Sequence, residues 1–458
     1  MESILNRVNT VIWGIPVLSL ILVSGIVLSI RSRMAQIRLF PAAIKQFLSS
    51  FQRSEMDSSC SGYRALCTAL AATVGTGNIA GVAGAIAIGG PGSIFWMWIC
   101  AILGMVTKLA EVTLAVHYRE KDTDGSYVGG PMYIIAKGLP ERTHFLACIY
   151  CFFGIVAALG VGNATQINAI IDGIRSIAGS THIHFGNRES LFFGVIIAAL
   201  VAWIFRKGAA GIGILAEKLV PLASVIYILL AMIVLCLRCN EIPEAIISIF
   251  IGAFSPKAAT GGILGSIFLT LRVGTSRGVF TNEAGMGTAS IAHAASDVDH
   301  PIQQGLMGIV EVFLDTIVIC TLTALVILCS GVTIPYGIDS GIFLTLDAFS
   351  SILGNWSKIL LTALTCIFAF ATLLGWGLYG ARCSQYLFGG HAWKRFIFAQ
   401  SGAVVLGAVL NTSVVWVLSE IVNGLMAIPN LIALTMLSGT FISILNDYQD
   451  NVKAYRLK

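Results

Sequence analysis

Long apolar stretches alternate with short polar ones along the whole chain, and this pattern predicts an all-α integral membrane protein. A helix needs about 20 apolar residues to cross a hydrocarbon core of about 30 Å. Eleven stretches approach or reach this length, which predicts about eleven transmembrane helices. They cover residues 11–30, 65–89, 93–116, 145–173, 190–205, 211–238, 260–290, 305–330, 356–382, 396–411 and 430–446.

Three further apolar pieces are amphipathic or too short to span, and we expect them to form helices at the outer surface. They cover residues 243–254, 341–353 and 413–426. The first long stretch, 11–30, has the length of a signal peptide. Its main basic residues follow the apolar core, however, and no small-residue cleavage pattern ends it. We therefore expect a retained first helix.

The distribution of Lys and Arg predicts the orientation of the chain, because basic residues are enriched in cytoplasmic loops. With the N-terminus outside, the inner loops and the C-terminus hold 19 of the 28 basic residues and the outer loops hold six. The remaining three, Lys108, Arg272 and Arg277, lie within spans. This bias predicts that the N-terminus is outside and the C-terminus inside, in a multi-pass protein of the cell membrane.

The amino-acid composition agrees with a membrane protein and argues against several other classes of protein. Only 11% of residues are charged, against about 25% in soluble domains. The net charge of +5 is scattered between the spans, so nucleic acid is not an expected partner. Most of the 11 cysteines lie in apolar runs, and the one C-x-x-C, Cys236 to Cys239, lacks a second pair for a metal site. No catalytic pair or phosphate loop is visible, so we expect neither an enzyme nor a cofactor.

A short motif in the second apolar stretch recurs in the seventh. Val74-Gly75-Thr76-Gly77-Asn78 is echoed 199 residues later at 273–277, which reads Val-Gly-Thr-Ser-Arg. Five spans separate the two copies, so they cross the membrane in opposite directions. This predicts an inverted repeat of five plus five helices, with one extra helix in front. The expected divisions are 1–64 for that helix and a basic loop, 65–240 for the first repeat, and 241–458 for the second.

The glycines of both copies predict an interruption of the helix in the middle of a span. Non-helical backbone is tolerated at membrane depth only where protein or a water-filled cavity surrounds it. The freed N–H groups and the positive end of the helix dipole suit a carboxylate. The freed carbonyl groups suit a small hard cation such as sodium. One interrupted helix is therefore suited to bind an amino acid and its coupling ion together.

The first motif has two other interpretations. Gly75-x-Gly77-x-x-Ala80 matches the dinucleotide-binding pattern, but that pattern needs a preceding strand and a later acidic residue. Apolar helix surrounds it here, which argues against a nucleotide site. The stronger alternative is close helix packing, since small residues at these spacings let two helices approach. The second copy of the motif favours interruption over packing.

Ionisable residues inside spans are candidate functional groups, because they are costly there. Arg272, Arg277 and Glu283 share the seventh stretch, and Glu311 and Asp315 lie one turn apart in the next. Buried charges are usually paired, so we prefer a structural role in which Arg277 pairs with Asp315 or Glu283.

Other polar or bulky residues within spans have a structural and a functional interpretation. Asn163 and Gln166 either bond to neighbouring helices or contact a substrate. Trp376 lies between glycines, where it either fills the core or closes a pocket to a small ligand. Thr372, one turn earlier, could supply a hydroxyl group to an ion.

Several longer motifs resemble those of the alanine or glycine:cation symporter family, from about residue 60 to the C-terminus. The resemblance implies the LeuT-type fold, eleven helices and sodium-coupled uptake of small neutral amino acids. The matching segments are VGTGNIAGVA (74–83), GGPGSIFWMW (89–98), YVGGPMYII (127–135), RGVFTNEAGMGTASIAHAA (277–295), FLDTIVICTLTALVILCSG (313–331) and LLGWGLYG (373–380).

The resemblance also implies roles for individual residues. The substrate would contact the first break, the fourth span, the second break and an aromatic cap. The residues that would contact the substrate are Thr76, Gly77, Asn78, Gln166, Gly274, Thr275, Gly278 and Trp376. Sodium would bind the carbonyl groups of Ala71, Val74 and Phe368 and the Thr372 hydroxyl, and a weaker second ion would lie near Asn78 and Thr270.

The chain departs from the family pattern at two places. Its second motif reads Gly-Thr-Ser-Arg-Gly, where the family usually has Gly-Val-Ala-Arg-Gly, and residues 288–291 read Thr-Ala-Ser-Ile. The extra hydroxyl groups of Thr275 and Ser276 would lie at the pocket, which makes serine or glutamine candidate substrates beside alanine and glycine.

The function expected from the sequence is a sodium-coupled importer of small neutral amino acids that works by alternating access. Its partners are then the amino acid, Na⁺ and the lipid bilayer. One alternative is proton coupling through Glu311 or Asp315. Another is a passive channel or a sensor on a degenerate transporter fold.

Overall fold

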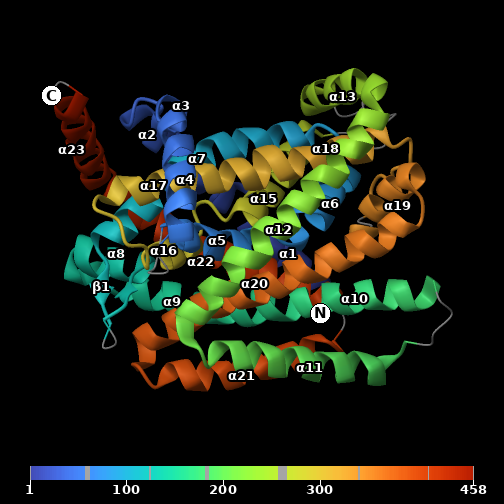
Figure 1. The fold of residues 1–458 in the computed structure, drawn as a ribbon. Coiled ribbons are helices and arrows are strands. Elements are labelled where there is room, and N and C mark those ends of the chain that lie inside the picture. Colours follow the sequence, from blue (N-terminus) through green and yellow to red (C-terminus); the bar gives the residue numbers. More distant parts are fainter. Residues whose placement is uncertain are drawn as a thin grey trace.

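The computed structural model describes residues 2–56, 62–122, 125–180, 185–255, 266–338, 341–410 and 412–456 (Figure 1). This part of the chain is almost entirely helical. One small antiparallel hairpin joins β1 (Glu120–Lys121) to β2 (Tyr127–Val128), with Glu120 opposite Val128. The all-α architecture predicted from the hydrophobic pattern is confirmed.

The helices of the first half include three that are not ordinary α-helix: η1 and η2 are 3₁₀ turns and η3 is a π-helix. In chain order the elements are α1 (Glu2–Ile12), α2 (Ile15–Arg31), α3 (Ala35–Arg38), α4 (Phe40–Met56), α5 (Gly62–Thr73), η1 (Thr76–Asn78), α6 (Ala80–Gly89), α7 (Ser93–His117), α8 (Pro131–Gly138), η2 (Glu141–Thr143), α9 (Phe145–Leu159), η3 (Gly160–Ala164), α10 (Thr165–Ser180), α11 (Asn187–Phe205) and α12 (Gly208–Leu237).

The second half contains a further 3₁₀ turn, η4, and a second π-helix, η5. Its elements are η4 (Cys239–Glu241), α13 (Ile242–Phe254), α15 (Ile267–Asn282), α16 (Thr288–His293), α17 (Pro301–Val312), η5 (Phe313–Cys320), α18 (Thr321–Cys329), α19 (Ile342–Leu353), α20 (Trp356–Phe388), α21 (Ala392–Gly407), α22 (Thr412–Met436) and α23 (Ser438–Arg456).

Nine of the eleven predicted spans have a helix, or a bent pair of helices, long and apolar enough to cross a membrane among the described residues. The two bent pairs are Gly62–Thr73 with Thr76–Gly89, at 59°, and Glu420–Met436 with Ser438–Asp450, at 58°. The seven unbent helices are Arg7–Arg31, Ser93–His117, Glu141–Arg175, Asn187–Phe205, Gly208–Leu237, Pro301–Cys329 and Trp356–Phe388.

The remaining two predicted spans correspond to shorter helices, so the count of eleven is not confirmed. α21 has 16 residues, and α15 also has 16. The predicted span at 260–290 begins at residues that lie outside the described part of the chain. The orientation of the termini and the three divisions of the chain stay predictions.

Two of the three predicted surface helices exist as separate elements. α13 and α19 cover the expected residues almost to the boundary. The third prediction, a separate piece at 413–426, is wrong. These residues form the first part of α22, a single helix of 25 residues. Neither Gly424 nor Pro429 ends this helix. Sequence analysis also missed α4, which lies in the segment expected to be a basic loop.

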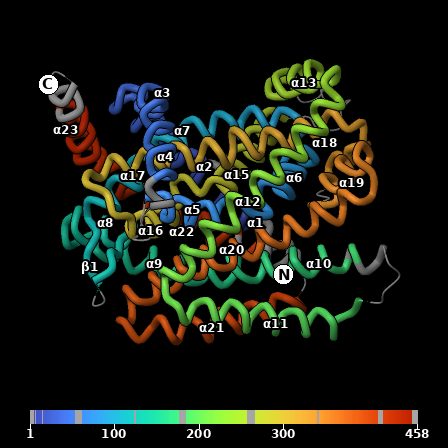
Figure 2. The backbone as a smooth tube through the Cα atoms, in the orientation of Figure 1, coloured from blue at the N-terminus to red at the C-terminus, as the bar shows by residue number. Residues whose placement is uncertain are grey.

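The core is built from helices that are far apart in the sequence. α7 packs against α15 and α17, and α20 packs against α9 and α10. α11 and α21 lie side by side along the lower edge of the view (Figure 2). α5 contacts both α16 and α20, so the first interrupted span lies next to elements of the second half. This arrangement places residues from both halves around the break after Thr73.

The outer surface carries many exposed, large apolar side chains. They are concentrated on α11 and α12, where Phe192, Trp203, Leu222 and Leu229 are more than half exposed. A water-soluble monomer rarely shows such a continuous apolar face. The surface is the one expected for helices in contact with lipid.

Candidate functional site

The first interrupted span has the break that the sequence predicts. α5 ends at Thr73, Gly75 adopts an extended conformation, and a 3₁₀ turn follows at Thr76–Asn78. The Gly75 N–H would normally bond to Ala71 one turn back. It donates instead to Oδ1 of Asn78, at 2.9 Å. The Asn78 side chain therefore holds the break open and leaves the Ala71 carbonyl without its intrahelical donor.

Three oxygen atoms meet beside this break. The Thr372 hydroxyl on α20 lies 3.0 Å from the Ala71 carbonyl oxygen and 3.0 Å from that of Phe368. One hydroxyl proton cannot satisfy both carbonyls at once, so the cluster retains acceptor capacity. Freed carbonyl groups of this kind coordinate Na⁺ in other interrupted helices. Three of the four residues predicted for sodium thus lie together, and Val74 is buried in the same break.

Gly75 is required at its position by this arrangement. A Cβ atom there would lie 2.8 Å from the Thr372 hydroxyl oxygen. Glycine is required at Gly375 on α20 for the same steric reason, since a Cβ atom there would lie 2.9 Å from the Ala72 nitrogen. The glycines on both helices therefore permit the backbone of α5 to approach α20.

The predicted substrate residues of the first half also lie together. Oγ1 of Thr76 donates to Oε1 of Gln166, at 3.3 Å, and both side chains are buried. Gln166 follows the π-helix η3 and donates to the Val161 carbonyl. Gly77 faces Phe280 and Thr281 at the end of α15.

Asn78 connects the break to a buried carboxylate. Its Nδ2 atom donates to Oδ1 of Asp315, at 2.7 Å, and to the Asp315 carbonyl, at 3.1 Å. The Thr316 hydroxyl donates to the other carboxylate oxygen, at 2.8 Å. Asp315 belongs to the second π-helix, η5. Asp315 was predicted to pair with Arg277, and its hydrogen-bond partners here are neutral instead.

The second break is not where the sequence predicts it. α15 runs as continuous helix from Ile267 to Asn282, through the whole of 273–277. The backbone leaves the helix at 283–287, where Glu283, Gly285 and Gly287 have φ of 53°, 91° and 78°. Glycine adopts such left-handed conformations without a steric penalty. The interruption therefore lies where glycines occupy positive-φ positions.

Gly274 and Gly278 serve close helix packing instead. A Cβ atom on Gly274 would lie 2.3 Å from the Ser93 carbonyl oxygen, and one on Gly278 would lie 3.2 Å from Cβ of Cys100. Both glycines face α7, one helical turn apart. Thr275 is buried, and its carbonyl accepts from Cys100. The alternative interpretation of the motif, small residues at a helix contact, is correct for this second copy.

Two residues that sequence analysis missed hold the second break. Glu111 accepts hydrogen bonds at Oε1 from the Gly287 N–H, at 3.2 Å, and from Nδ2 of Asn430, at 2.6 Å. Asn430 also donates to the Gly285 carbonyl, at 2.9 Å. Both side chains are buried. An acidic residue in the middle of an apolar stretch is a signal that could have identified Glu111.

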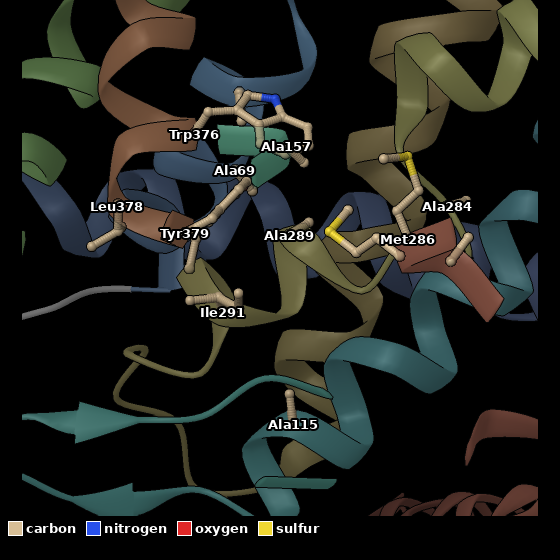
Figure 3. Close-up of a cluster of buried hydrophobic side chains, with 14 of the residues drawn as sticks. Ala69, Ala115, Ala157, Ala284, Met286, Ala289, Ile291, Trp376, Leu378 and Tyr379 are labelled. Carbon is tan, nitrogen blue, oxygen red and sulfur yellow. The ribbon is translucent and has the colours of Figure 1, made fainter. Parts of the chain in front are cut away.

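Trp376 is buried between the two breaks. A Cβ atom on Gly162 of η3 would lie 2.1 Å from Cβ of Trp376, so only glycine allows this approach. Figure 3 shows Trp376 beside Ala157, with Tyr379 of the same helix nearby. The ring centroids of Trp376 and Tyr379 are 5.9 Å apart.

The residues predicted for a second, weaker ion do not lie together. Thr270 donates to the Gly89 carbonyl, at 2.8 Å, at the far end of α6 from Asn78. α6 has ten residues, so its two ends are about 15 Å apart at 1.5 Å per residue. Asn78 and Thr270 therefore cannot share one sodium ion in this conformation.

Arg277 and Glu311 form ion pairs within the spans, but Arg277 does not pair with the predicted partners. Arg277 pairs with Glu420 at 3.3 Å, not with Asp315 or Glu283. Glu311 pairs with Lys108 at 3.1 Å and contacts His293 at 2.9 Å.

The Glu311 cluster continues to the start of the first interrupted span. His293 contacts Gln304, at 2.6 Å, and Gln304 donates to the Gly62 carbonyl, at 3.1 Å. Within the described residues, no group of three or more His, Cys, Asp or Glu could hold a metal ion. The groups at the first break are backbone groups, hydroxyls, amides and the Asp315 carboxylate.

The chain is similar to known membrane transporters along its whole length. The model of the sodium:alanine symporter family matches residues 1–458. The sodium/alanine symporter AgcS of Methanococcus maripaludis is 40% identical over 445 residues, which cover 96% of each chain. The "Probable sodium/glutamine symporter GlnT" of Bacillus subtilis is 37% identical over 461 residues, covering 99% of this chain and 92% of that protein.

A solved structure supports the fold separately. The crystal structure of MhsT in complex with L-phenylalanine matches with a TM-score of 0.58, covering 83% of this chain and 97% of that chain. At 17% identity, this likeness concerns the fold alone. It agrees with the LeuT-type architecture that the sequence predicts.

Proposed function

This chain belongs to the sodium:alanine symporter family, and from that premise we propose that it imports small neutral amino acids together with sodium across the cell membrane. Membership of the family makes the chain an amino-acid symporter rather than an enzyme. Transport proceeds by alternating access. The amino acid, the coupling ion and the direction are the parts of the proposal that need experiments.

The observation that carries the proposal is the break in the first span. Thr76 and Gln166 bring a hydroxyl and an amide to the start of α6. The N-terminus of a helix offers unpaired N–H groups and a partial positive charge to an anion. An amino-acid carboxylate binds there, next to the residues that the family resemblance assigns to substrate.

Sodium binds on the other side of the same break. Its ligands are the Ala71 and Phe368 carbonyl oxygens and the Thr372 hydroxyl oxygen, and each carbonyl oxygen already lies 3.0 Å from the hydroxyl oxygen. Val74 supplies a further carbonyl. Because α5 and α20 each contribute ligands, bound sodium stabilises the contact between them. Sodium thereby favours the conformation that binds the amino acid.

We expect a small substrate, because the Trp376 side chain fills the space next to η3 and leaves little room for a large one. Thr275 and Ser276 made serine and glutamine candidates, but these residues lie on the continuous part of α15 and not at an interruption of it. We therefore place alanine and glycine first, with serine and glutamine as the next candidates. Names of relatives mention alanine for one protein and glutamine for another.

Uptake into proteoliposomes tests the proposal. Labelled alanine, glycine, serine and glutamine are offered with an inward gradient of sodium or of choline. We expect accumulation only with sodium, and faster uptake with an inside-negative potential, because one inward positive charge gains about 2.3 kcal/mol per 100 mV. Equal uptake in sodium and choline would disprove sodium coupling. Failure to concentrate any solute would favour a passive channel or a sensor.

Proton coupling through Asp315 is a second candidate, favoured by the direct contact between Asp315 and Asn78. Protonation of Asp315 would change the hydrogen bonds that Asn78 makes at the break. If this candidate is correct, a pH gradient drives uptake without sodium, and Asp315→Asn abolishes that coupling. Sodium-driven uptake that is insensitive to a pH gradient would exclude it.

A further inference from the structure

Exposed basic residues gather where the first span ends and the chain continues into α3 and α4. The sequence has no Asp or Glu from residue 3 to residue 54. Four basic side chains at the end of α2, on either side of α3 and on α4 are exposed, and together we call them the basic surface. They are Arg31, Arg33, Arg38 and Lys45. The charge distribution of the chain predicts that this surface lies on the cytoplasmic side of the membrane.

α4 has the position and the two faces of a helix that lies at the membrane surface. It crosses α17 instead of running alongside it (Figure 1), and it packs against that helix. One face is turned to the protein, where Ala43 and Ser50 are buried and Phe47 is half-buried. The opposite face carries Lys45 and Leu48, which are exposed. A helix with these two faces lies in the plane of the interface when its exposed side also carries apolar groups.

Apolar side chains accompany the basic ones on the exposed side. Ile37 and Leu48 are more than half exposed. Further exposed apolar side chains in the same stretch are those of Ile30, Met34 and Phe51. Interfacial helices combine cationic groups with apolar groups that enter the boundary between headgroups and acyl chains. The composition of this exposed side therefore suits a lipid surface better than it suits water alone.

The protein itself does not neutralise the basic surface. Arg31 and Arg38 donate to neutral oxygen atoms of hydroxyl, carbonyl and amide groups. The side chains of Arg33 and Lys45 make no hydrogen bond or ion pair with the part of the chain that the structure describes. Four positive charges without a carboxylate partner among those residues are available to an external anion.

The turn that presents these charges is fixed. Arg33 and Met34 have φ of 55° and 53°, which residues other than glycine rarely adopt. The Met34 N–H donates to the Ser29 carbonyl, at 2.7 Å, and Nε2 of the buried Gln36 donates to the Ser29 hydroxyl, at 2.8 Å. The chain therefore turns from the span into α3 in one defined conformation. A surface that is already ordered loses little conformational entropy when it binds.

We propose that the basic surface binds the headgroups of anionic phospholipids in the cytoplasmic leaflet. The guanidinium groups of Arg33 and Arg38 donate to phosphate oxygens, and Lys45 adds a further positive charge. Ile37 and Leu48 lie against the upper part of the acyl chains. A zwitterionic lipid has the same phosphate but no net charge, so the surface selects anionic lipid by electrostatics. This lipid site is independent of which solute or ion the protein transports.

Binding of two lipids that differ only in the headgroup tests the proposal. The purified full-length protein is titrated with phosphatidylglycerol or phosphatidylcholine of identical acyl chains, and native mass spectrometry measures the affinity for each. Each basic residue near an anionic surface is worth about a fivefold gain in affinity. We expect tighter binding of phosphatidylglycerol, and a preference that falls about tenfold or more in the Arg33→Gln, Lys45→Gln double variant. Because neither side chain has a partner among the described residues, this variant folds normally.

Two control variants separate the headgroup from the acyl chains and from charge elsewhere. Lys394→Gln with Arg395→Gln removes two exposed charges at the start of α21, on the same predicted side, and leaves the preference unchanged. Ile37→Ser with Leu48→Ser keeps every charge, so it weakens the binding of both lipids and leaves the preference between them unchanged.

Thermal unfolding gives a second measurement, since a ligand of the folded state stabilises it by mass action. Phosphatidylglycerol raises the unfolding temperature of the natural sequence more than phosphatidylcholine does, and the Arg33→Gln, Lys45→Gln variant loses this difference. Inorganic phosphate at the same concentration produces no such rise, because it lacks the acyl chains.

Three results would overturn the lipid site. They are equal affinity of the natural sequence for both lipids, a preference that the Arg33→Gln, Lys45→Gln variant retains in full, and an equal loss of preference in the Lys394→Gln, Arg395→Gln variant. None of them bears on amino-acid uptake. Absence of sodium-driven uptake would in turn contradict the proposed function and leave the lipid site intact.

Discussion

At the scale of single residues, Thr372 links the two helices that form the proposed sodium site. Its hydroxyl reaches the Ala71 carbonyl on one helix and the Phe368 carbonyl on its own. Thr365, two turns earlier on α20, is buried too, but its hydroxyl reaches only the Leu361 carbonyl on the same helix. The two threonines therefore provide a matched comparison.

We predict that Thr372→Val raises the sodium concentration for half-maximal uptake about tenfold or more, because valine keeps the shape but removes one ligand oxygen. Thr365→Val leaves the sodium dependence unchanged. Both variants lose about 1 kcal/mol of stability from a missing hydrogen bond. Sodium titrations of alanine uptake measure the effect. An identical sodium dependence for the two variants would exclude Thr372 as a ligand.

Sequence alone could identify some of these residues but not their partners. Thr76, Gln166, Ala71 and Thr372 lie beside the first break, and their roles stay predictions. The roles of Glu111 and Asn430 could not be predicted, because they depend on which backbone atoms the folded second break exposes to them. The pairing of Arg277 with Glu420 could not be predicted either, because more than 140 positions separate the two residues and only the fold brings them together.

At the scale of elements, the two copies of the motif have different roles. The first copy interrupts a span, whereas the second forms the contact between α15 and α7. Both uses need glycine at short spacings, so composition could not separate them. The conformations at Gly285 and Gly287 locate the actual second break. The π-helices η3 and η5 could not be predicted either, since the extra residue in a turn has no compositional signature.

We predict that Gly274→Ala destabilises the protein more than Gly278→Ala does. The Gly274 Cβ would meet a backbone oxygen at 2.3 Å, which cannot move aside easily, whereas the Gly278 Cβ would meet Cys100 at 3.2 Å. Overpacking of this kind costs about 1–3 kcal/mol, and we expect less than about 1 kcal/mol for Gly278→Ala. Thermal unfolding of the purified variants measures the difference.

A control comes from Gly402 on α21, where a Cβ atom meets nothing within 4 Å. Gly402→Ala should be neutral or slightly stabilising, because alanine favours helix. If Gly274→Ala were as stable as Gly402→Ala, the close contact between α15 and α7 would not exist in the folded protein.

At the scale of the whole molecule, the hydrophobic pattern predicted most of the architecture. Seven long helices and the two bent pairs coincide with nine of the eleven apolar stretches. The pattern failed for α4 and for the first part of α22. α4 is amphipathic rather than apolar, and it packs against α17 of the core. An apolar pattern identifies helices surrounded by lipid more readily than helices that cover a bundle on one side.

The orientation across the membrane remains to be measured, and the exposed cysteines provide a test. Cys236 and Cys239 lie at the end of α12, which the charge distribution places outside, and Cys148 lies near the start of α9, which it places inside. We predict that a membrane-impermeant maleimide labels intact cells at Cys236 or Cys239. Labelling should disappear in the Cys236→Ser, Cys239→Ser double variant.

Cys148 should react only after the cells are made permeable. Labelling of Cys148 in intact cells, without labelling of the other two, would mean that the chain has the opposite orientation.

The side-chain amide of Gln304 has a consequence for the timing of transport. It connects the first residue of α5 with the last residue of α16, through the Gly62 carbonyl and His293. Neither half-helix can swing away alone without breaking a buried hydrogen bond. We therefore expect the two half-helices to move together when solute is released toward that end. Such joint movement would limit slippage, in which an ion crosses without its companion solute.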